Sequence, residues 1–174
     1  MSGGFNNDWN TTYILSLKIL SLSSKDFLEN FSNILKIANT SHVNDPYDRI
    51  SHVREEIKPF KDKFSNKNIM NIDKKLFSFS KQLDESGLKG AENKIFSDPN
   101  VDTNALYQFK KFLCHPGTFN NNIVAILFDE LFYGSKLYYK IHNIPRKFTN
   151  VNGSIDSEKI LLDKKQLNST VKLF

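Results

Sequence analysis

The sequence predicts an all-α fold: a single-domain, irregular bundle of about six to seven helices with a C-terminal arm. Two patterns favour it. Apolar residues recur at spacings of three and four along most of the chain, and residues that begin or end helices stand between these stretches. A third observation is the composition, 39% hydrophobic and 25% charged over 174 residues, which is typical of one water-soluble core.

The first two helices are expected on either side of a serine-rich turn. The apolar residues of Trp9–Leu22 fit one side of a helix, although some of them also fit the alternation of a strand. The N-cap chemistry for a clearer helix comes from Ser23, Ser24 and Asp26; its apolar face runs over Phe27–Ala38, and Asn39 ends it.

The third helix is expected to begin at Asp45 and Pro46. Proline has no backbone N–H, and it is tolerated in the first turn of a helix because the N–H groups there have no acceptor within the helix. Its apolar residues form a narrow seam over Ile50–Phe64. Pro59 lies inside that seam, where it removes a backbone donor and clashes with the carbonyl four residues earlier. We therefore expect a kink or a break near Lys58.

Four further helices complete the predicted bundle. The patterns indicate helices over Ile69–Leu83 and Ala91–Phe96, and a third that Asp102 or Thr103 caps. The longest apolar stretch, from about Asn121 to Ile141, is hydrophobic around most of its circumference. A helix of that kind is expected at the centre of the bundle.

These patterns predict three parts along the chain: a flexible leader over residues 1–8, a helical core domain over 9–148, and a linker with an amphipathic arm over 149–174. The leader offers little to bury, and Pro145 and Gly153 mark the linker. Such an arm docks either on its own core or on a partner. The apolar residues expected to bind a partner are Ile160, Leu161, Leu162 and Leu167.

The amino-acid usage carries information about the source and the compartment. Asn and Lys are abundant, with 20 and 21 residues, whereas Ala occurs only four times although it is the best helix former. This bias indicates an AT-rich genome, such as that of a virus, a mobile element or an intracellular organism. Cys114 is the single cysteine, which favours a reducing, cytoplasmic location. The best apolar run ends at Asp129 and Glu130, so no membrane span is expected.

The motifs of common enzymes and cofactor sites do not occur in the sequence. It has no glycine-rich phosphate loop, and one cysteine with four dispersed histidines does not make a zinc site. We therefore expect no cofactor, metal or small-molecule substrate. The densest ionisable group lies between His42 and Glu56, where a carboxylate could orient His52. Solvated helix charges are the favoured interpretation of this group, and an enzyme is the third alternative overall.

The favoured function is that of a non-enzymatic helical binding protein, an accessory protein that works through a protein partner or through self-association. The alternative is binding of RNA or single-stranded DNA by basic residues interleaved with aromatic ones, since Lys neutralises phosphate and Tyr stacks on bases. The residues proposed for this alternative form two stretches: Lys136, Tyr139, Lys140, Arg146 and Lys147, and Lys58, Lys61, Lys63 and Lys67.

Overall fold

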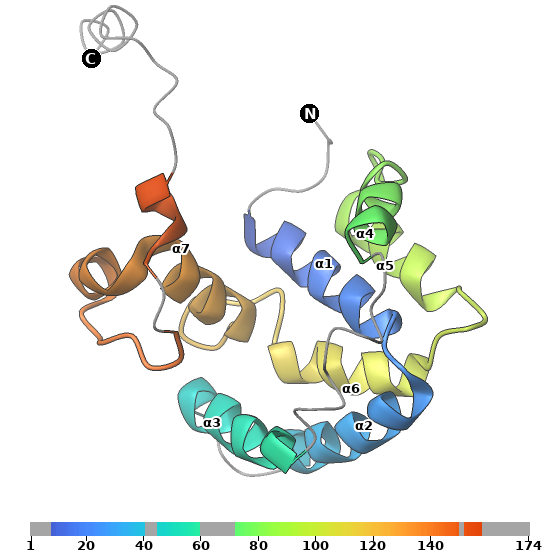
Figure 1. The fold of residues 1–174 in the computed structure, drawn as a ribbon, viewed down its shortest axis with the longest axis horizontal. Coiled ribbons are helices and arrows are strands. Elements are labelled where there is room, and N and C mark those ends of the chain that lie inside the picture. The colour runs from blue at the N-terminus through green and yellow to red at the C-terminus, as the bar shows by residue number, and fades with distance from the viewer. Residues whose placement is uncertain (1–7, 41–44, 60–71, 150–151, 158–174) are drawn as a thin grey trace, which may run out of the picture. The chain divides into compact units, whose positions relative to one another are not determined.

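The computed structural model describes residues 8–40, 45–59, 72–149 and 152–157. Over these residues the chain forms seven α-helices and no strand (Figure 1), which confirms the predicted all-α fold. The chain divides into two compact units, Met1–Ile126 and Leu127–Phe174. The division into leader, core and arm stays a prediction, because much of the leader and of the arm lies outside the described residues.

Helix α1 (Asp8–Ser21) lies where the sequence allowed either a helix or a strand. Its buried residues are Tyr13, Ile14, Leu17 and Leu20, at helical spacings of one, three and three. In the first unit α1 contacts α4, α5 and α6. The helix therefore forms because its apolar stripe finds helical partners, which local sequence alone does not reveal.

Helix α2 (Lys25–Thr40) packs most extensively against α6 and also contacts α3 (Figure 1). The Oγ atom of Ser24 accepts a hydrogen bond from the backbone N–H of Phe27 at 3.4 Å, as expected for an N-cap residue. At the other end, the side-chain amide of Asn39 donates to the backbone carbonyl of Gln108 in α6 at 2.9 Å. A polar contact thus joins the end of α2 to its main partner.

Helix α3 (Pro46–Ile57) begins and ends where the sequence indicates. Asp45 is the N-cap, and its carboxylate accepts hydrogen bonds from the backbone N–H groups of Tyr47 at 2.7 Å and Asp48 at 3.3 Å. The helix ends at Ile57, next to Lys58, which confirms the predicted break. The remainder of the predicted seam, from Phe60 onward, lies outside the described residues.

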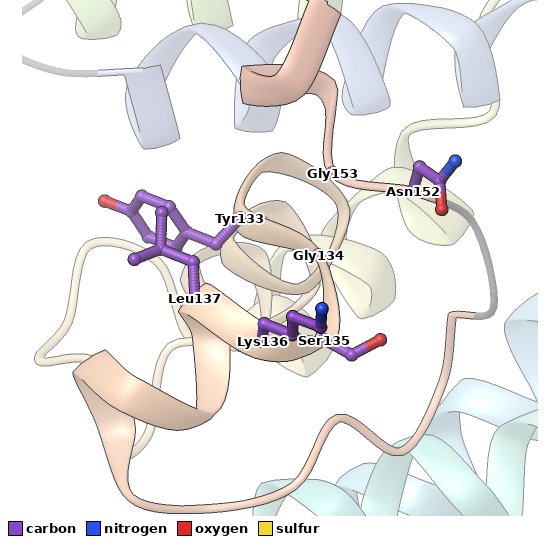
Figure 2. A pocket seen from close by; sticks show the side chains of 7 residues that line it. All are labelled: Tyr133, Gly134, Ser135, Lys136, Leu137, Asn152 and Gly153. Atoms are coloured by element: carbon purple, nitrogen blue, oxygen red, sulfur yellow. The ribbon is translucent and has the colours of Figure 1, made fainter.

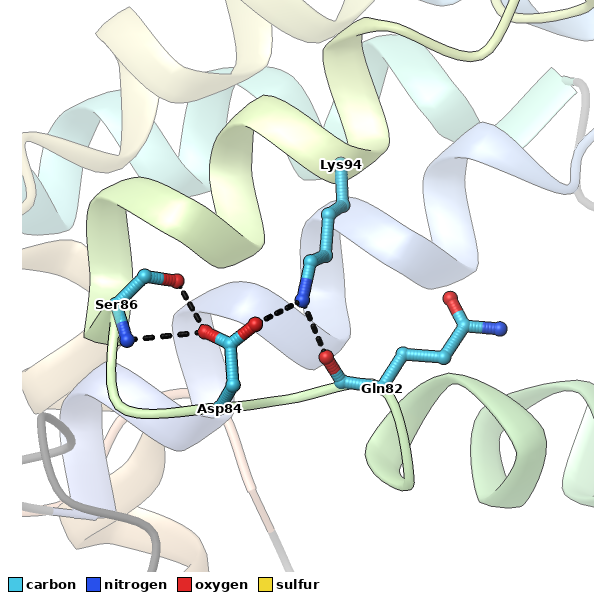
Figure 3. Close-up of polar contacts among 4 residues, drawn as sticks. All are labelled: Gln82, Asp84, Ser86 and Lys94. Atoms are coloured by element: carbon cyan, nitrogen blue, oxygen red, sulfur yellow. Dashed lines mark hydrogen bonds and ion pairs between the residues drawn. The ribbon is translucent and has the colours of Figure 1, made fainter.

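Helices α4 (Ile72–Ser80) and α5 (Gly87–Phe96) are joined by a turn that a carboxylate organises (Figure 3). Asp84 accepts hydrogen bonds from the backbone N–H and the hydroxyl of Ser86, and its Oδ2 atom lies 2.6 Å from Nζ of Lys94. The Lys94 ammonium also donates to the carbonyl of Gln82. The bonds from Lys94 and Ser86 hold the pKa of Asp84 well below its usual range.

Helix α6 (Thr103–Leu113) is capped by Asp102, which accepts hydrogen bonds from the backbone N–H groups of Asn104 at 3.0 Å and Ala105 at 3.1 Å. Of the two residues predicted as the cap, Asp102 and Thr103, Asp102 is therefore the N-cap. Ala105 and Leu106 are completely buried, so one face of α6 belongs to the core of the first unit. The same helix contacts both α1 and α2.

Helix α7 (Ile123–His142) is interrupted at Gly134, a break that the sequence analysis did not predict. Gly134 has φ 66° and ψ 179°, a conformation that side-chain-bearing residues rarely adopt. Gly153, just before the short 3-10 helix η3 (Ser154–Ser157), lies against this break, and a Cβ atom on it would be 2.6 Å from the Gly134 nitrogen. Although α7 is the longest described helix, no helix in the described part of the chain is long and apolar enough to cross a membrane.

Candidate nucleic-acid interface

The segment of α7 after the break presents two lysines and a tyrosine on one face. Lys136, Tyr139 and Lys140 stand at positions i, i+3 and i+4 of a helix, so their side chains are neighbours. All three are exposed, and Tyr139 is 55% exposed although it is a large aromatic residue. We call these three residues the α7 strip. The sequence analysis selected them because basic and aromatic residues are interleaved in this stretch.

Glu130, in the first segment of α7, is completely buried and organises the loop that follows the helix. Its carboxylate accepts hydrogen bonds from the backbone N–H groups of Lys147 at 2.8 Å, Phe148 at 2.9 Å and Thr149 at 3.1 Å. Three backbone donors thus provide hydrogen-bond partners for this carboxylate inside the protein. The carboxylate of Glu130 is therefore hydrogen-bonded within the unit and is not exposed to solvent.

Asp129 is also buried, with 4% of its surface exposed. Its Oδ2 atom lies 3.0 Å from Nε2 of His142, at the C-terminal end of α7. The rings of Tyr133 and Tyr138 lie beside the same imidazole, with centroid distances of 6.3 and 4.7 Å. Asp129 is thus paired with a histidine that itself contacts two aromatic rings, and it adds no exposed acidic group.

The result is a one-sided distribution of charge over residues 127–149. The two acidic residues of this segment are buried, whereas Lys136, Lys140 and Lys147 are exposed and Arg146 is half-buried. The charged side chains that reach solvent along these residues are therefore all basic. Such a surface attracts polyanions, and the exposed ring of Tyr139 lies among the charges.

A hollow of about 350 Å³ lies at the break of α7, next to the strip. We call it the α7 hollow. Figure 2 shows Ser135 and Lys136 on one side of the helix and Tyr133 and Leu137 on the other. The residues that line it are Tyr133, Gly134, Ser135, Lys136, Leu137, Asn152 and Gly153. The hollow offers hydrogen-bonding groups and one ammonium beside the exposed face.

The other basic residues predicted to bind nucleic acid lie in different surroundings. Lys147 is exposed, and both it and Arg146 lie in the loop that Glu130 holds, in the same unit as the α7 strip. Lys58 is exposed and pairs with Glu55 at 2.5 Å, a contact that is typical of a solvated helix end. The other residues predicted to bind nucleic acid or a partner lie outside the described part of the chain; they are Lys61, Lys63, Lys67, Ile160, Leu161, Leu162 and Leu167.

The ionisable group around α3 is dispersed where the structure describes it. Asp45 caps the helix, and Asp48 and His52 are exposed. His42 lies outside the described residues. Within the described ranges, no three His, Cys, Asp or Glu residues are close enough together to hold a metal ion.

A buried polar network around His115 was missed by sequence reasoning. His115 is 7% exposed, and its Nε2 atom lies 2.8 Å from Oδ1 of Asn10, while its Nδ1 atom lies 3.1 Å from Nδ2 of Asn122. Asn122 is completely buried and also accepts a hydrogen bond from the backbone N–H of Ala125. With an acceptor on one nitrogen and a donor on the other, the ring is held as the neutral tautomer.

The network continues to a second buried group through ring stacking. The ring of His115 stacks on Tyr13 at a centroid distance of 4.6 Å. The Tyr13 hydroxyl donates to Glu92 at 2.5 Å, and Lys110 donates to the other oxygen of Glu92 at 2.7 Å. Burial, aided by Glu92, raises the pKa of Tyr13 above its usual range. No local pattern predicts this network, because its members are far apart in the sequence.

Comparisons with protein-family models, with curated proteins and with solved structures gave no match. The function therefore has to be argued from the side chains themselves.

Proposed function

We propose that the chain is a non-enzymatic binding protein for single-stranded nucleic acid, RNA or DNA, and that the α7 strip is its contact surface. The observation that carries the proposal is the charge distribution of residues 127–149. Both acidic residues are buried there, while the lysines on either side of Tyr139 are exposed. This arrangement complements a single strand, because the lysines can neutralise its phosphates and the tyrosine ring can stack on an accessible base.

The chemistry of the strip also predicts which kind of recognition to expect. Lysine is a flexible point charge that neutralises a phosphate without reading a base. Tyr139 can stack on any base, because every base has a π-face. We therefore propose binding that tolerates many sequences and prefers single strands, in which the bases are open to stacking.

Substitution of the strip tests the proposal directly. Fluorescence anisotropy of a labelled oligodeoxythymidylate at about 50 mM salt, where backbone contacts are strong, gives the affinity. Lys136→Gln with Lys140→Gln, or Tyr139→Ala alone, is expected to weaken binding about tenfold, because each change removes phosphate contacts or one stacked base. All three side chains are exposed, so the fold is expected to be unaffected.

The matched control is Lys36→Gln with Lys89→Gln, which makes the same change in net charge at exposed positions of α2 and α5. Its affinity should stay within about twofold of the original, since general charge attraction is weaker than direct contact. Equal losses in the control and the strip variants, or no measurable binding by the unmodified chain, would contradict the proposal.

Binding of a protein partner, or self-association, is the second candidate. The second unit exposes two large apolar side chains, Leu131 at 47% and Ile141 at 48%, which favours contact with another protein surface. The apolar arm residues named above belong to this proposal. Sedimentation of the full chain and of a version that ends at Gly153 should give different association states; equal states would remove the candidate. A cytoplasmic location is part of both proposals, because a lone Cys114 suits a reducing compartment.

A further inference from the structure

A second hollow lies in the first unit, at the C-terminal end of α6. It has a volume of about 360 Å³, which falls within the range of small-ligand sites. We call it the α6 hollow. Tyr107 stands at its edge and is 61% exposed. The residues that line the hollow are Tyr107, Lys110, Lys111, Cys114, His115 and Pro116.

The charges at the α6 hollow are positive. None of the six lining residues is acidic, and Lys111 is exposed. Lys110 pairs with Glu92, whose carboxylate is largely buried, so this lysine contributes less charge than Lys111 does. The guanidinium of Arg49 donates to Sγ of Cys114 at 3.0 Å, which adds a positive charge beside one lining residue.

The walls of the α6 hollow are held in place by the core. His115 is fixed by Asn10, Asn122 and the ring of Tyr13. Cys114, which ends α6 with φ 52°, is held by Arg49. A ligand that enters the hollow therefore meets a pre-formed wall and does not have to order it.

The α6 hollow and the α7 strip combine the same residue types, one tyrosine and two lysines on one helix, although their order along the helix differs and they lie in different units. In the hollow, Lys110 and Lys111 follow Tyr107 at positions i+3 and i+4 of one helix, so an exposed ring stands next to two ammonium groups. We infer that the α6 hollow is a second binding site, which takes one nucleotide of a single-stranded nucleic acid with its base on Tyr107 and its phosphate at Lys111. The ligand class rests on the proposed function, but the site and its residues are separate from the strip.

The single cysteine of the chain provides a reporter at this site. Cys114 lines the hollow and is half-buried, so its alkylation by iodoacetamide measures access to the hollow. A saturating oligodeoxythymidylate of about ten nucleotides, within the usual site size of a single-strand binder, is expected to slow alkylation about fivefold or more. The variant Lys136→Gln, Tyr139→Ala, Lys140→Gln should retain this protection at a higher oligonucleotide concentration.

Substitutions at the hollow separate a contact from an indirect effect. Tyr107→Ala with Lys111→Gln removes the proposed stacking and phosphate contacts at two exposed positions, and it should abolish the protection of Cys114. The control Lys36→Gln with Lys89→Gln should keep it. The same hollow variant is expected to weaken binding measured by anisotropy about tenfold, the size of one lost stacking contact.

The outcomes distinguish the two proposals. If the oligonucleotide binds and the strip variants weaken it, but Cys114 reacts at an unchanged rate, the second site is wrong and the proposed function stands. Protection that persists in the Tyr107→Ala, Lys111→Gln variant would also overturn the second site. If the unmodified chain binds no oligonucleotide, both proposals fail together.

Discussion

At the scale of single residues, the burial of Glu130 keeps one negative charge of residues 127–149 away from solvent. A buried carboxylate is stable only where donors surround it, and three backbone N–H groups do so here. Lysine is frequent throughout the chain, but composition alone does not explain why the neighbouring acids are buried. The exposed positive charge is therefore a property of the fold and not only of the composition.

Glu130→Gln tests this role. Glutamine keeps the shape of the side chain but turns one acceptor into a donor, which would face the N–H groups of the loop. We expect the free energy of unfolding to fall by about 1–3 kcal/mol, as for the loss of hydrogen bonds to a charged group. Urea denaturation measures it, with Glu29→Gln at an exposed position of α2 as the control. Equal midpoints for the two variants would show that Glu130 does not hold the loop.

His115 predicts how stability depends on pH. Burial lowers the pKa of His115, so the folded state binds fewer protons than the unfolded state as the pH falls below the ordinary histidine pKa of about 6.5. Stability from this residue is present above that pH and is lost on acidification towards the folded pKa. Denaturation midpoints at pH 7.5 and 5.5 should differ less in His115→Gln than in the unmodified chain. An equal difference in both proteins would exclude His115 as the cause.

At the scale of elements, the sequence predicted helix ends well where the responsible residues are local. Asp45 caps α3 and Asp102 caps α6 through the N–H groups of the next few residues, so both caps could be read from a short window. The break at Gly134 could not, because a glycine within an apolar stretch is compatible with an unbroken helix. At the break, Gly134 lies against Gly153, which is 19 positions later in the sequence and outside any local window.

Gly134→Ala tests the break. An added Cβ would lie 2.6 Å from the nitrogen and 3.0 Å from the Cα of Gly153, and the positive φ is unfavourable for alanine. We expect the variant to lose about 1–3 kcal/mol of unfolding free energy, the usual cost of local backbone strain. Ser135→Ala, at the next and exposed position, is the control. A variant as stable as the control would indicate that the close approach of the two glycines is unimportant.

The candidate site could be predicted only where its residues are close together in the sequence. The three residues of the α7 strip could be identified because basic and aromatic residues are interleaved within one short stretch of the sequence. The burial of Asp129 and Glu130 could not be identified, since it depends on His142 and on a loop that returns to the helix. The α6 hollow was missed because His115 is placed by Asn10, which is 105 positions away.

At the scale of the whole molecule, the chain carries a net charge of +5 and consists of two units, each with an exposed tyrosine next to two lysines. Each unit can be tested by itself through its own substitutions, in the full-length chain. The account thus predicts that strip and hollow variants weaken binding separately and that the combined variant binds least.

The most direct test of the central claim is the salt dependence of binding to a single-stranded oligonucleotide. Each phosphate contact contributes about 0.7 to the slope of log affinity against log salt concentration, because binding releases condensed counterions. The variant Lys136→Gln, Lys140→Gln should therefore have a slope that is shallower by about 1.4 than that of the unmodified chain, while Lys36→Gln with Lys89→Gln leaves it unchanged. Identical slopes for the unmodified chain and the strip variant would contradict the claim that the α7 strip contacts phosphates.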